Sequence, residues 1–410
     1  MIQTIKEIKV GLCFDKDIQP IGRLAIRDQI IYFEYDQAFL QNGLEISPFR
    51  LPAQRGVTTL PSRPFEGLAG VFNDSLPDGW GRLLFDRLAR SQGIFPADIS
   101  PLDRLAHVGL FGMGALVYQP DNSPTDNRDI IDLDYLAAQT EEILAGSSED
   151  ILQELLALNG SSTGARPKAL IGVNDNYSKI TFGAKQLANN FQPWLVKFSN
   201  LQDGSDAGAI EYVYSLMAKE AGLVMPDTHL FSAKDGAGYF AVRRFDRHNG
   251  KRLHMHTASG LLHNDFRVPS LDYEDLVNLT SILTRDIREV EKMFRIAVFN
   301  ILAHNRDDHS KNFSFLMDHT GEWKLAPAYD LTFSTGPNGE QSTMVMGEGR
   351  KPGIPHLKKL GLEVNIDKNK IDEIIEQTRS ALQKWTILAK NQAIKKENIE
   401  LINKTLSNIK

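Results

Sequence analysis

The residues best suited to chemistry lie within residues 304–331, which read HNRDDHSKNFSFLMDHTGEWKLAPAYDL. Asp307 and Asn312 are five positions apart, and Asp330 follows eighteen positions later. A carboxylate can accept the proton of an attacking hydroxyl, while amide and carboxylate oxygens are ligands that magnesium prefers. The set is therefore suited to phosphoryl transfer, with Asp307 as the catalytic base and Asn312 and Asp330 as magnesium ligands.

A hairpin between Asn312 and Asp330 would bring these side chains together. Residues 313–317 read as a strand, 318–321 as a turn and 323–326 as the returning strand. The spacing from Asp307 to Asn312 is that of the protein-kinase catalytic loop, and Asp330 takes the place of the aspartate of the Asp-Phe-Gly motif. The tripeptide here is Asp-Leu-Thr, so we do not expect the conformational switching of that motif.

Other interpretations of these residues remain open. Asp, Asn and His in a loop after a helix are commonly caps and turn residues. A metal hydrolase could be built on Asp307, Asp308 and His309, but adjacent side chains in an extended loop diverge and rarely share one ion. The pair His254 and His256 could bind a metal if extended, but with no third ligand evident we expect a surface strand or loop.

A cation for the phosphates is expected upstream. Lys197 ends the β-type run PWLVKF, and Glu211 on the following helix could pair with it, because a buried lysine is costly without a partner. A solubilising edge lysine and a solvated glutamate are the alternatives. The Gly/Ser loop of residues 159–170, NGSSTGARPKAL, could bring backbone N–H groups, with Arg166 or Lys168, near phosphate oxygens. An ordinary flexible loop is equally compatible with it.

The pattern along the chain divides it into four parts, as an α+β fold. We expect a β-rich subdomain at residues 1–118, a linker and helix at 119–150, a β-rich nucleotide-binding lobe with one internal helix at 151–250, and an α-helical lobe with the catalytic loop at 251–410. The amphipathic run DIREVEKMFRIAVFNILAHN of the last part should place Ile287, Val290, Phe294, Val298 and Ile301 on one face.

Composition limits the compartment and the partners. The 410 residues carry a formal charge of -6, which argues against a surface built mainly for nucleic acid. The single cysteine, Cys13, excludes an intramolecular disulfide and a thiolate zinc cluster. The first residues lack the apolar core of a secretory signal, and no stretch has the length of a membrane span. We therefore expect a cytoplasmic protein with no membrane partner.

Six blocks in order along the chain resemble the HipA-type serine/threonine kinase toxins of type II toxin-antitoxin systems. They are FNDSLPDGWGR (72–82), GSSTGARPKALI (160–171), WLVKF (194–198), RRFDR (243–247), NRDDHSKNFS (305–314) and APAYDL (326–331). The resemblance implies a protein-kinase-like two-lobe fold with an added N-terminal β-rich subdomain and an all-helical C-terminal lobe. It also implies ATP and Mg²⁺ as cofactors, an aminoacyl-tRNA synthetase as the class of protein substrate, and a helix-turn-helix antitoxin as partner, with DNA contacted only through that antitoxin.

The same resemblance assigns roles position by position. Asp307 resembles the catalytic base, Asn312 and Asp330 the magnesium ligands, Lys197 the phosphate-binding lysine and Glu211 its ion-pair partner. Arg243 stands where some members carry a glutamate, so contacts to adenine there should come from the backbone. The nucleotide-binding set that the family blocks indicate comprises Thr163, Gly164, Ala165, Arg166, Pro167 and Lys168 of the phosphate loop, Arg243, Arg244 and Phe245 of the hinge, and His309, Lys311 and Tyr329.

Ser161 and Ser162 fall where family members carry an autophosphorylated serine. A phosphate on either would repel the phosphates of ATP and would switch the enzyme off. A catalytically silent nucleotide-binding module and a small-molecule kinase are the alternative functions for the whole chain.

Overall fold

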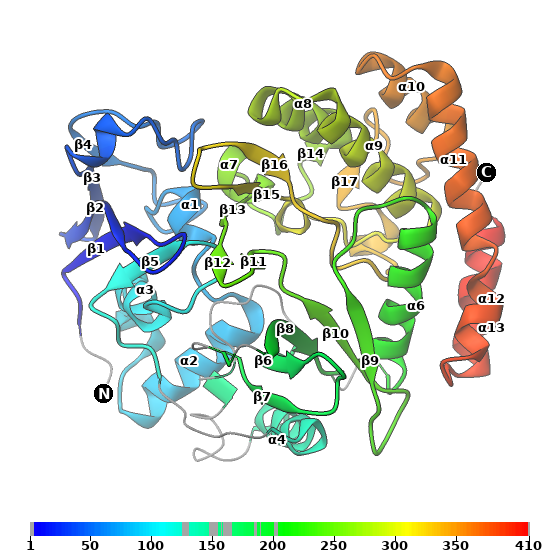
Figure 1. Cartoon of the computed structure of the whole chain (residues 1–410), viewed down its shortest axis with the longest axis horizontal. Coiled ribbons are helices and arrows are strands. Elements are labelled where there is room, and N and C mark those ends of the chain that lie inside the picture. Colours follow the sequence, from blue (N-terminus) through cyan, green and yellow to red (C-terminus); the bar gives the residue numbers. More distant parts are fainter. Residues whose placement is uncertain are drawn as a thin grey trace.

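Figure 1 shows the computed structural model of the chain. The structure describes residues 4–124, 131–146, 155–156, 158, 166–183, 187–188, 190–200 and 204–408. Among the helices of these ranges, none combines the length and the apolar character needed to cross a bilayer.

The N-terminal part is built on a five-stranded antiparallel sheet with the order β4-β3-β2-β1-β5. In β1, Ile8 and Val10 are buried while Glu7 and Lys9 are exposed, the alternation expected of a sheet with one face in the core. The strands are β1 (Glu7–Leu12), β2 (Gln19–Arg27), β3 (Ile30–Tyr35), β4 (Val57–Thr59) and β5 (Leu116–Gln119).

Helices follow this sheet and lead to the second part. One of them is α2 (Gly79–Ser91), and α3 (Pro101–Val108) begins with a capping box between Ser100 and Asp103. The other helical segments here are η1 (Phe39–Gln41), α1 (Gly70–Asn73), η2 (Pro96–Asp98) and α4 (Leu133–Ala145).

The second sheet has the order β7-β6-β8-β10-β9, and α6 (Ala207–Glu220) lies along it (Figure 1). Its register places Lys168 of β6 directly opposite Lys197 of β8. The strands β9 and β10 pair antiparallel as a hairpin, and α6 ends before Gly222, whose φ is +80°. The strands are β6 (Lys168–Asn174), β7 (Ile180–Phe182), β8 (Phe191–Lys197), β9 (Thr228–Phe231) and β10 (Tyr239–Arg243).

The remaining part is mainly helical and carries three small sheets, β11-β12, β13-β15-β16 and β14-β17. The expected hairpin after Asn312 is present as β15 (Ser314–Met317) and β16 (Trp323–Leu325). Its other strands are β11 (Arg247–His248), β12 (Lys251–Arg252), β13 (His254–Thr257), β14 (Leu271–Asp272) and β17 (Thr343–Met344). Its helices are α7 (Ala258–Leu262), α8 (Tyr273–Thr284), α9 (Ile287–Leu302), η3 (Ser310–Asn312), η4 (Pro337–Gly339), α10 (Ile354–Glu363), α11 (Lys368–Leu382), α12 (Trp385–Lys390) and α13 (Lys396–Ser407).

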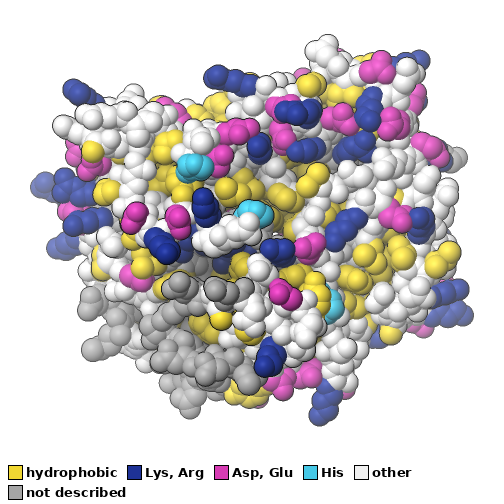
Figure 2. All heavy atoms as spheres, viewed as in Figure 1, with side chains coloured by type: hydrophobic (Ala, Val, Ile, Leu, Met, Phe, Trp, Pro, Cys, Tyr) yellow, Lys and Arg dark blue, Asp and Glu magenta, His cyan; other side chains and the backbone are white. Residues whose placement is uncertain are grey.

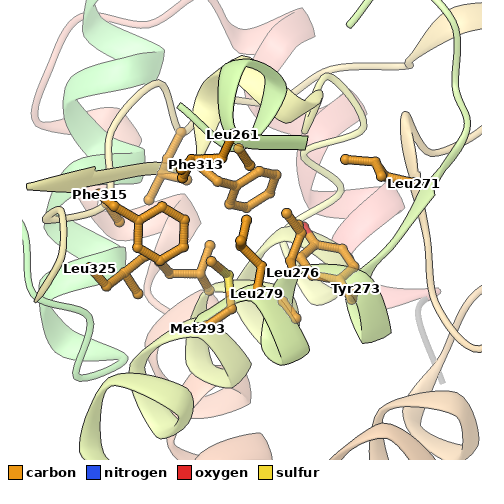
Figure 3. Close-up of a cluster of buried hydrophobic side chains, with 14 of the residues drawn as sticks. Leu261, Leu271, Tyr273, Leu276, Leu279, Met293, Phe313, Phe315 and Leu325 are labelled. Atoms are coloured by element: carbon orange, nitrogen blue, oxygen red, sulfur yellow. The ribbon is translucent and has the colours of Figure 1, made fainter. Parts of the chain in front are cut away.

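One hydrophobic cluster runs from the N-terminal sheet into the helical part, so the two share a core. Figure 3 shows part of it, where Phe313 and Phe315 of the catalytic segment pack with Tyr273 and Met293. Of the predicted face of α9, Val290, Phe294, Val298 and Ile301 are buried, but Ile287 is 60% exposed because it opens the helix. The residue after Asn312 is thus anchored in the core, which fixes the end of the catalytic loop.

Candidate active site

A cavity of about 650 Å³ is lined by residues of the N-terminal part, of the second sheet with α6, and of the mainly helical part. Over the face of the molecule shown in Figure 2, acidic and basic side chains are interspersed rather than segregated by sign. The cavity itself is lined by Arg166, Lys168, Lys197, Glu211, Arg243, Arg244, Phe245, Asp307, His309, Lys311, Asn312, Tyr329 and Asp330, together with residues from the N-terminal part. All the predicted catalytic and metal-binding residues therefore face one space.

A hydrogen bond from Asn312 to Asp307 closes the predicted catalytic loop, which lies between α9 and β15. The Nδ2 atom of Asn312 donates to the backbone oxygen of Asp307 at 2.8 Å, which leaves the amide oxygen as the atom that a cation would need. Burial raises the pKa of the Asp307 carboxyl above its usual value, His309 opposes this rise, and the negative charge of Asp330 adds to it. A carboxyl with a raised pKa is a stronger base, which suits proton acceptance.

The neighbouring Asp308 does not line the cavity, and its side chain holds the loop in place. It is completely buried, and its carboxylate accepts hydrogen bonds from the Tyr273 hydroxyl at 2.6 Å, the Gln341 amide at 3.0 Å and the backbone N–H groups of Ser342 and Thr343 at 3.1 Å. Burial raises its pKa to about 6, although these hydrogen bonds act in the other direction. Such a satisfied buried network rigidifies the segment that carries Asp307.

Lys197, Glu211 and Asp330 form the electrostatic centre of the cavity. The ammonium of Lys197 lies 2.5 Å from Glu211 Oε1 and 2.5 Å from Asp330 Oδ1, which joins the sheet, α6 and the segment after the hairpin. Burial opposes the charged form of Lys197, but the two carboxylates raise its pKa overall. The pKa of Asp330 is lowered, because the attraction of Lys197 and Lys168 outweighs the effect of burial. Asp330 therefore stays ionised, as a metal ligand must be.

Two further features of this centre are the burial of Glu211 and the unusual backbone conformation of Asp330. Burial raises the pKa of Glu211 in spite of Lys197, and its side chain is only 4% exposed, so the alternative of a solvated glutamate is wrong. Asp330 has a φ of +56°, an uncommon conformation for a residue other than glycine. Strained residues of this kind cluster at functional sites, where the surrounding structure imposes them.

The donor set fits a magnesium ion. Asn312 and Asp330 would offer an amide oxygen and a carboxylate, which are hard ligands, and magnesium usually completes its shell with waters and phosphate oxygens rather than with more protein groups. The described residues contain no cluster of three or more His, Cys, Asp or Glu side chains arranged for a metal. The metal-hydrolase interpretation of Asp307, Asp308 and His309 thus lacks support, because Asp308 is engaged in its buried network.

The predicted phosphate loop is only partly within the described ranges. Ser161, Ser162, Thr163, Gly164 and Ala165 lie outside them. Arg166 lies 4.0 Å from Glu211 at the cavity, and the carbonyl of Pro167 accepts from the backbone N–H of Phe198. Lys168 lines the cavity, and burial, together with the nearby charge of Lys197, lowers its pKa to about 8.

The hinge segment turns out to have a structural component that sequence reasoning missed. The Arg244 guanidinium donates to both carboxylate oxygens of the buried Asp246, at 3.0 and 2.7 Å. Arg247 binds the same carboxylate at 2.6 Å, and the backbone N–H of Gly114 donates to it at 2.7 Å. Arg244 and Arg247 also donate to the carbonyl of Gly112. The segment therefore clamps the loop of residues 110–114 against the cavity, with Met113 among the lining residues.

Phe245 of the hinge segment packs beside the segment that carries Asp330. The rings of Phe245 and Tyr329 are 5.3 Å apart, and the Tyr329 hydroxyl donates to the backbone oxygen of Lys311 at 2.6 Å. Tyr329 directly precedes Asp330, so this hydrogen bond links the predicted catalytic loop to the segment that carries Asp330.

The expected surface location of His254 and His256 is wrong. Both are completely buried on β13, where the imidazole of His254 bonds the carbonyl of Ile46 at 2.9 Å. His256 lies between Ser47 at 3.0 Å and Asp74 at 2.6 Å. This resembles a Ser-His-Asp triad in outline, but Ser47 is also completely buried, so no substrate reaches it. The histidines instead join the N-terminal part to the mainly helical part.

The N-terminal block FNDSLPDGWGR also contributes to the cavity, which its sequence alone did not reveal. Asp74, Ser75, Asp78 and Gly79 are lining residues, and Asp78 pairs with Lys311 of the catalytic loop at 2.6 Å. The only signal was the density of turn-forming and charged residues in this block.

Comparisons with known proteins agree with this architecture. Residues 160–385 match the HipA-like C-terminal domain, and residues 16–119 match the HipA N-terminal domain. The “Putative kinase Y4mE” of Sinorhizobium fredii is 25% identical over 396 residues, which cover 86% of each chain. A chain of the Shewanella oneidensis MR-1 toxin-antitoxin complex of HipA, HipB and operator DNA has a TM-score of 0.68 at 16% identity, covering 97% of this chain and 94% of that one. At that identity the structural likeness establishes the fold, which is the expected kinase-like one.

Proposed function

The chain belongs to the HipA family of kinases, and from this we propose that it transfers the γ-phosphate of ATP, with Mg²⁺, to a serine or threonine hydroxyl of a protein. The observation that carries the proposal is the position of Lys197 between Glu211 and Asp330, in the same cavity as Asp307 and Asn312. This is the set of groups that phosphoryl transfer by a kinase needs.

The proposed mechanism follows from the roles of the side chains. Asp307 takes the proton of the acceptor hydroxyl, the hydroxyl oxygen bonds to the γ-phosphorus, and the bond from that phosphorus to the bridging oxygen breaks, releasing ADP. Asn312 and Asp330 would hold the metal ion, which would supply positive charge to neutralise the phosphates. Lys197 binds phosphate oxygens and is oriented by Glu211. Most of the rate enhancement would come from positioning and charge stabilisation.

The partners proposed for this chain derive from the family. We propose that it is the toxin of a toxin-antitoxin pair in the cytoplasm, that its protein substrate is of the aminoacyl-tRNA synthetase class, and that a helix-turn-helix antitoxin binds it. The Shewanella relative is in a complex with HipB and operator DNA. With a formal charge of -6, this chain would contact DNA mainly through the antitoxin.

Autophosphorylation at Ser161 or Ser162 is part of the same proposal. A phosphate there would place about two negative charges near the site of the ATP phosphates and would reduce nucleotide binding.

The experiment is to incubate the purified chain with γ-labelled ATP and Mg²⁺, alone and with a bacterial lysate, and to identify labelled proteins and sites by mass spectrometry. Asp307→Asn is the matched variant, because it keeps the side-chain volume but removes the proton acceptor. We expect it to lose transfer while nucleotide binding, measured by calorimetry, persists.

Each alternative function gives a distinct outcome. A nucleotide-binding module without catalysis would bind ATP but label nothing, and a small-molecule kinase would consume ATP and label no protein. Transfer that persists in Asp307→Asn would refute the assigned base.

A further inference from the structure

The pair formed by Asp78 and Lys311 joins two parts of the chain that are far apart in sequence. Asp78 Oδ2 and Lys311 Nζ are 2.6 Å apart across 233 residues, and the two side chains are 19% and 5% exposed. The ring of Phe266 lies 4.6 Å from the same ammonium, and Phe266 also contacts the ring of His309. The ammonium is therefore enclosed by groups from three segments, all of which line the cavity.

Asp78 stands at the start of a helix but does not cap it. Asp78 is the N-cap residue of α2, a position where aspartate normally accepts a hydrogen bond from the first turn. Its side chain accepts no such capping bond. The next residue, Gly79, has a φ of +42°, which side chains disfavour, so the turn that presents Asp78 depends on glycine. The carboxylate faces the catalytic loop at the expense of capping its own helix.

Lys311 is placed where a small displacement would disturb both metal ligands. It directly precedes Asn312 in η3, and its backbone oxygen accepts from the hydroxyl of Tyr329, the residue before Asp330. A buried ammonium is stable only with a partner, so the conformation of Lys311 depends on Asp78. The charge of Asp78 also acts on Lys168 of the second sheet. One carboxylate thus affects cations on two sides of the cavity.

We propose that Asp78 is a positioning residue for phosphoryl transfer, which holds Lys311 so that the neighbouring Asn312 keeps its metal-binding geometry. The N-terminal part is then a component of the active site. This inference rests on the proposed function. The contrasting possibility is that Asp78 occupies the place of a phosphate group until ATP arrives, and the two ideas predict opposite changes in ATP affinity.

The test compares Asp78→Asn with the wild-type protein in steady-state transfer of γ-labelled phosphate and in calorimetric ATP binding with Mg²⁺. A positioning role predicts that kcat falls about 10- to 100-fold, the range expected when reacting groups are slightly misplaced, while ATP affinity does not increase. Asp78→Glu should restore part of kcat, because it keeps the carboxylate. Asp367→Asn is the matched control, since Asp367 is the N-cap of α11 and lies outside the lining of the cavity.

The double variant Asp78→Asn with Lys311→Gln keeps the test decisive if the single variant does not fold, because it leaves no unpaired charge. It should lose no more activity than the worse of the two single variants, since both remove the same contact. Wild-type kcat in a folded Asp78→Asn or in the double variant would overturn the proposal. Tighter ATP binding with unchanged kcat would instead identify Asp78 as a phosphate substitute. Failure of the wild-type protein to transfer phosphate would refute the proposed function itself.

Discussion

Lys197 and Asp330 are 133 positions apart in the chain, and the Lys197 ammonium lies 2.5 Å from the carboxylate oxygen Oδ1 of Asp330. Glu211 lies at the same distance from that ammonium. One cation therefore serves two carboxylates in a buried setting, so its removal should affect both stability and nucleotide binding.

The first prediction concerns Lys197→Met. Loss of the cation leaves the buried Glu211 carboxylate and the 33% exposed Asp330 carboxylate without their shared partner. We expect the free energy of unfolding to fall by about 3 kcal/mol, the low end of the range for broken buried pairs, because solvent partly screens Asp330. ATP binding should be lost as well. Urea unfolding and calorimetry measure the two effects. Arg82→Met is the control, because Arg82 and Glu66 form a half-exposed pair at 3.1 Å that should contribute less than about 1 kcal/mol. Equal effects of both substitutions would contradict the prediction.

The second prediction concerns the pH dependence of transfer. Asp307 must be ionised to accept a proton, so kcat/KM should fall as the pH is lowered through its pKa. Because burial and Asp330 raise that pKa, the acid limb of the profile should lie above pH 4, near which an ordinary aspartate titrates.

A substitution of His309, which lowers the pKa of Asp307, tests this prediction. His309→Gln removes the interaction that lowers the pKa of Asp307, so the acid limb should move to higher pH. His319→Gln, at the exposed turn of the hairpin, should leave the limb in place. An unchanged profile in His309→Gln would show that Asp307 is not the titrating base.

The third prediction concerns Tyr273→Phe, at a residue that does not line the cavity. The Tyr273 hydroxyl donates to Asp308 at 2.6 Å and accepts from the amide of Asn300 at 2.9 Å, all within the buried network. Its removal leaves buried polar atoms unsatisfied and should cost about 1–3 kcal/mol of stability. Since Asp308 holds the loop that carries Asp307, kcat should fall while ATP affinity is retained.

Thermal unfolding and single-turnover kinetics measure these two effects. Tyr135→Phe serves as a control, because Tyr135 is 52% exposed on α4. Loss of ATP affinity in parallel with kcat would point to general unfolding rather than to displacement of the loop.

The fourth prediction concerns stability in acid. Burial and the proximity of His256 lower the pKa of His254 from 6.5 to about 4, so the unfolded chain binds a proton at pH values where the folded one does not. Because protons favour the unfolded chain in this range, the free energy of unfolding falls as the pH is lowered from about 6.5 to 4. At neutral pH His254 is neutral in both states and causes no such loss. Between pH 7 and pH 5, His254→Gln should therefore reduce the loss of unfolding free energy by about 2 kcal/mol.

Denaturant unfolding at the two pH values is the measurement. The exposed His248, replaced by Gln, should leave the difference unchanged. If His254→Gln also leaves it unchanged, His254 does not stay neutral in the folded protein.

Features encoded within short stretches could be predicted from the sequence. The helix α9, the hairpin of β15 and β16, and the loop that carries Asp307 and Asn312 each follow from local periodicity and turn residues. The pairing of Lys197 with Glu211 was accessible because a known arrangement of strand and helix brings such a pair together.

The contacts that were missed join residues more than a hundred positions apart. No local pattern links Asp78 to Lys311, Asp74 to His256, or Asp246 to Gly114. In each case the partner is brought close only by the fold, so the sequence around either residue does not reveal the contact. His254 and His256 were placed at the surface for this reason.

The clamp around Asp246 has a practical consequence for ligand design. It fixes the loop that presents Met113, so one wall of the cavity is supplied from outside the matched C-terminal domain. A competitive inhibitor extended toward Met113 would contact a surface that an enzyme without this N-terminal part does not possess. Selectivity over kinases that lack this N-terminal part is therefore expected to come from that wall.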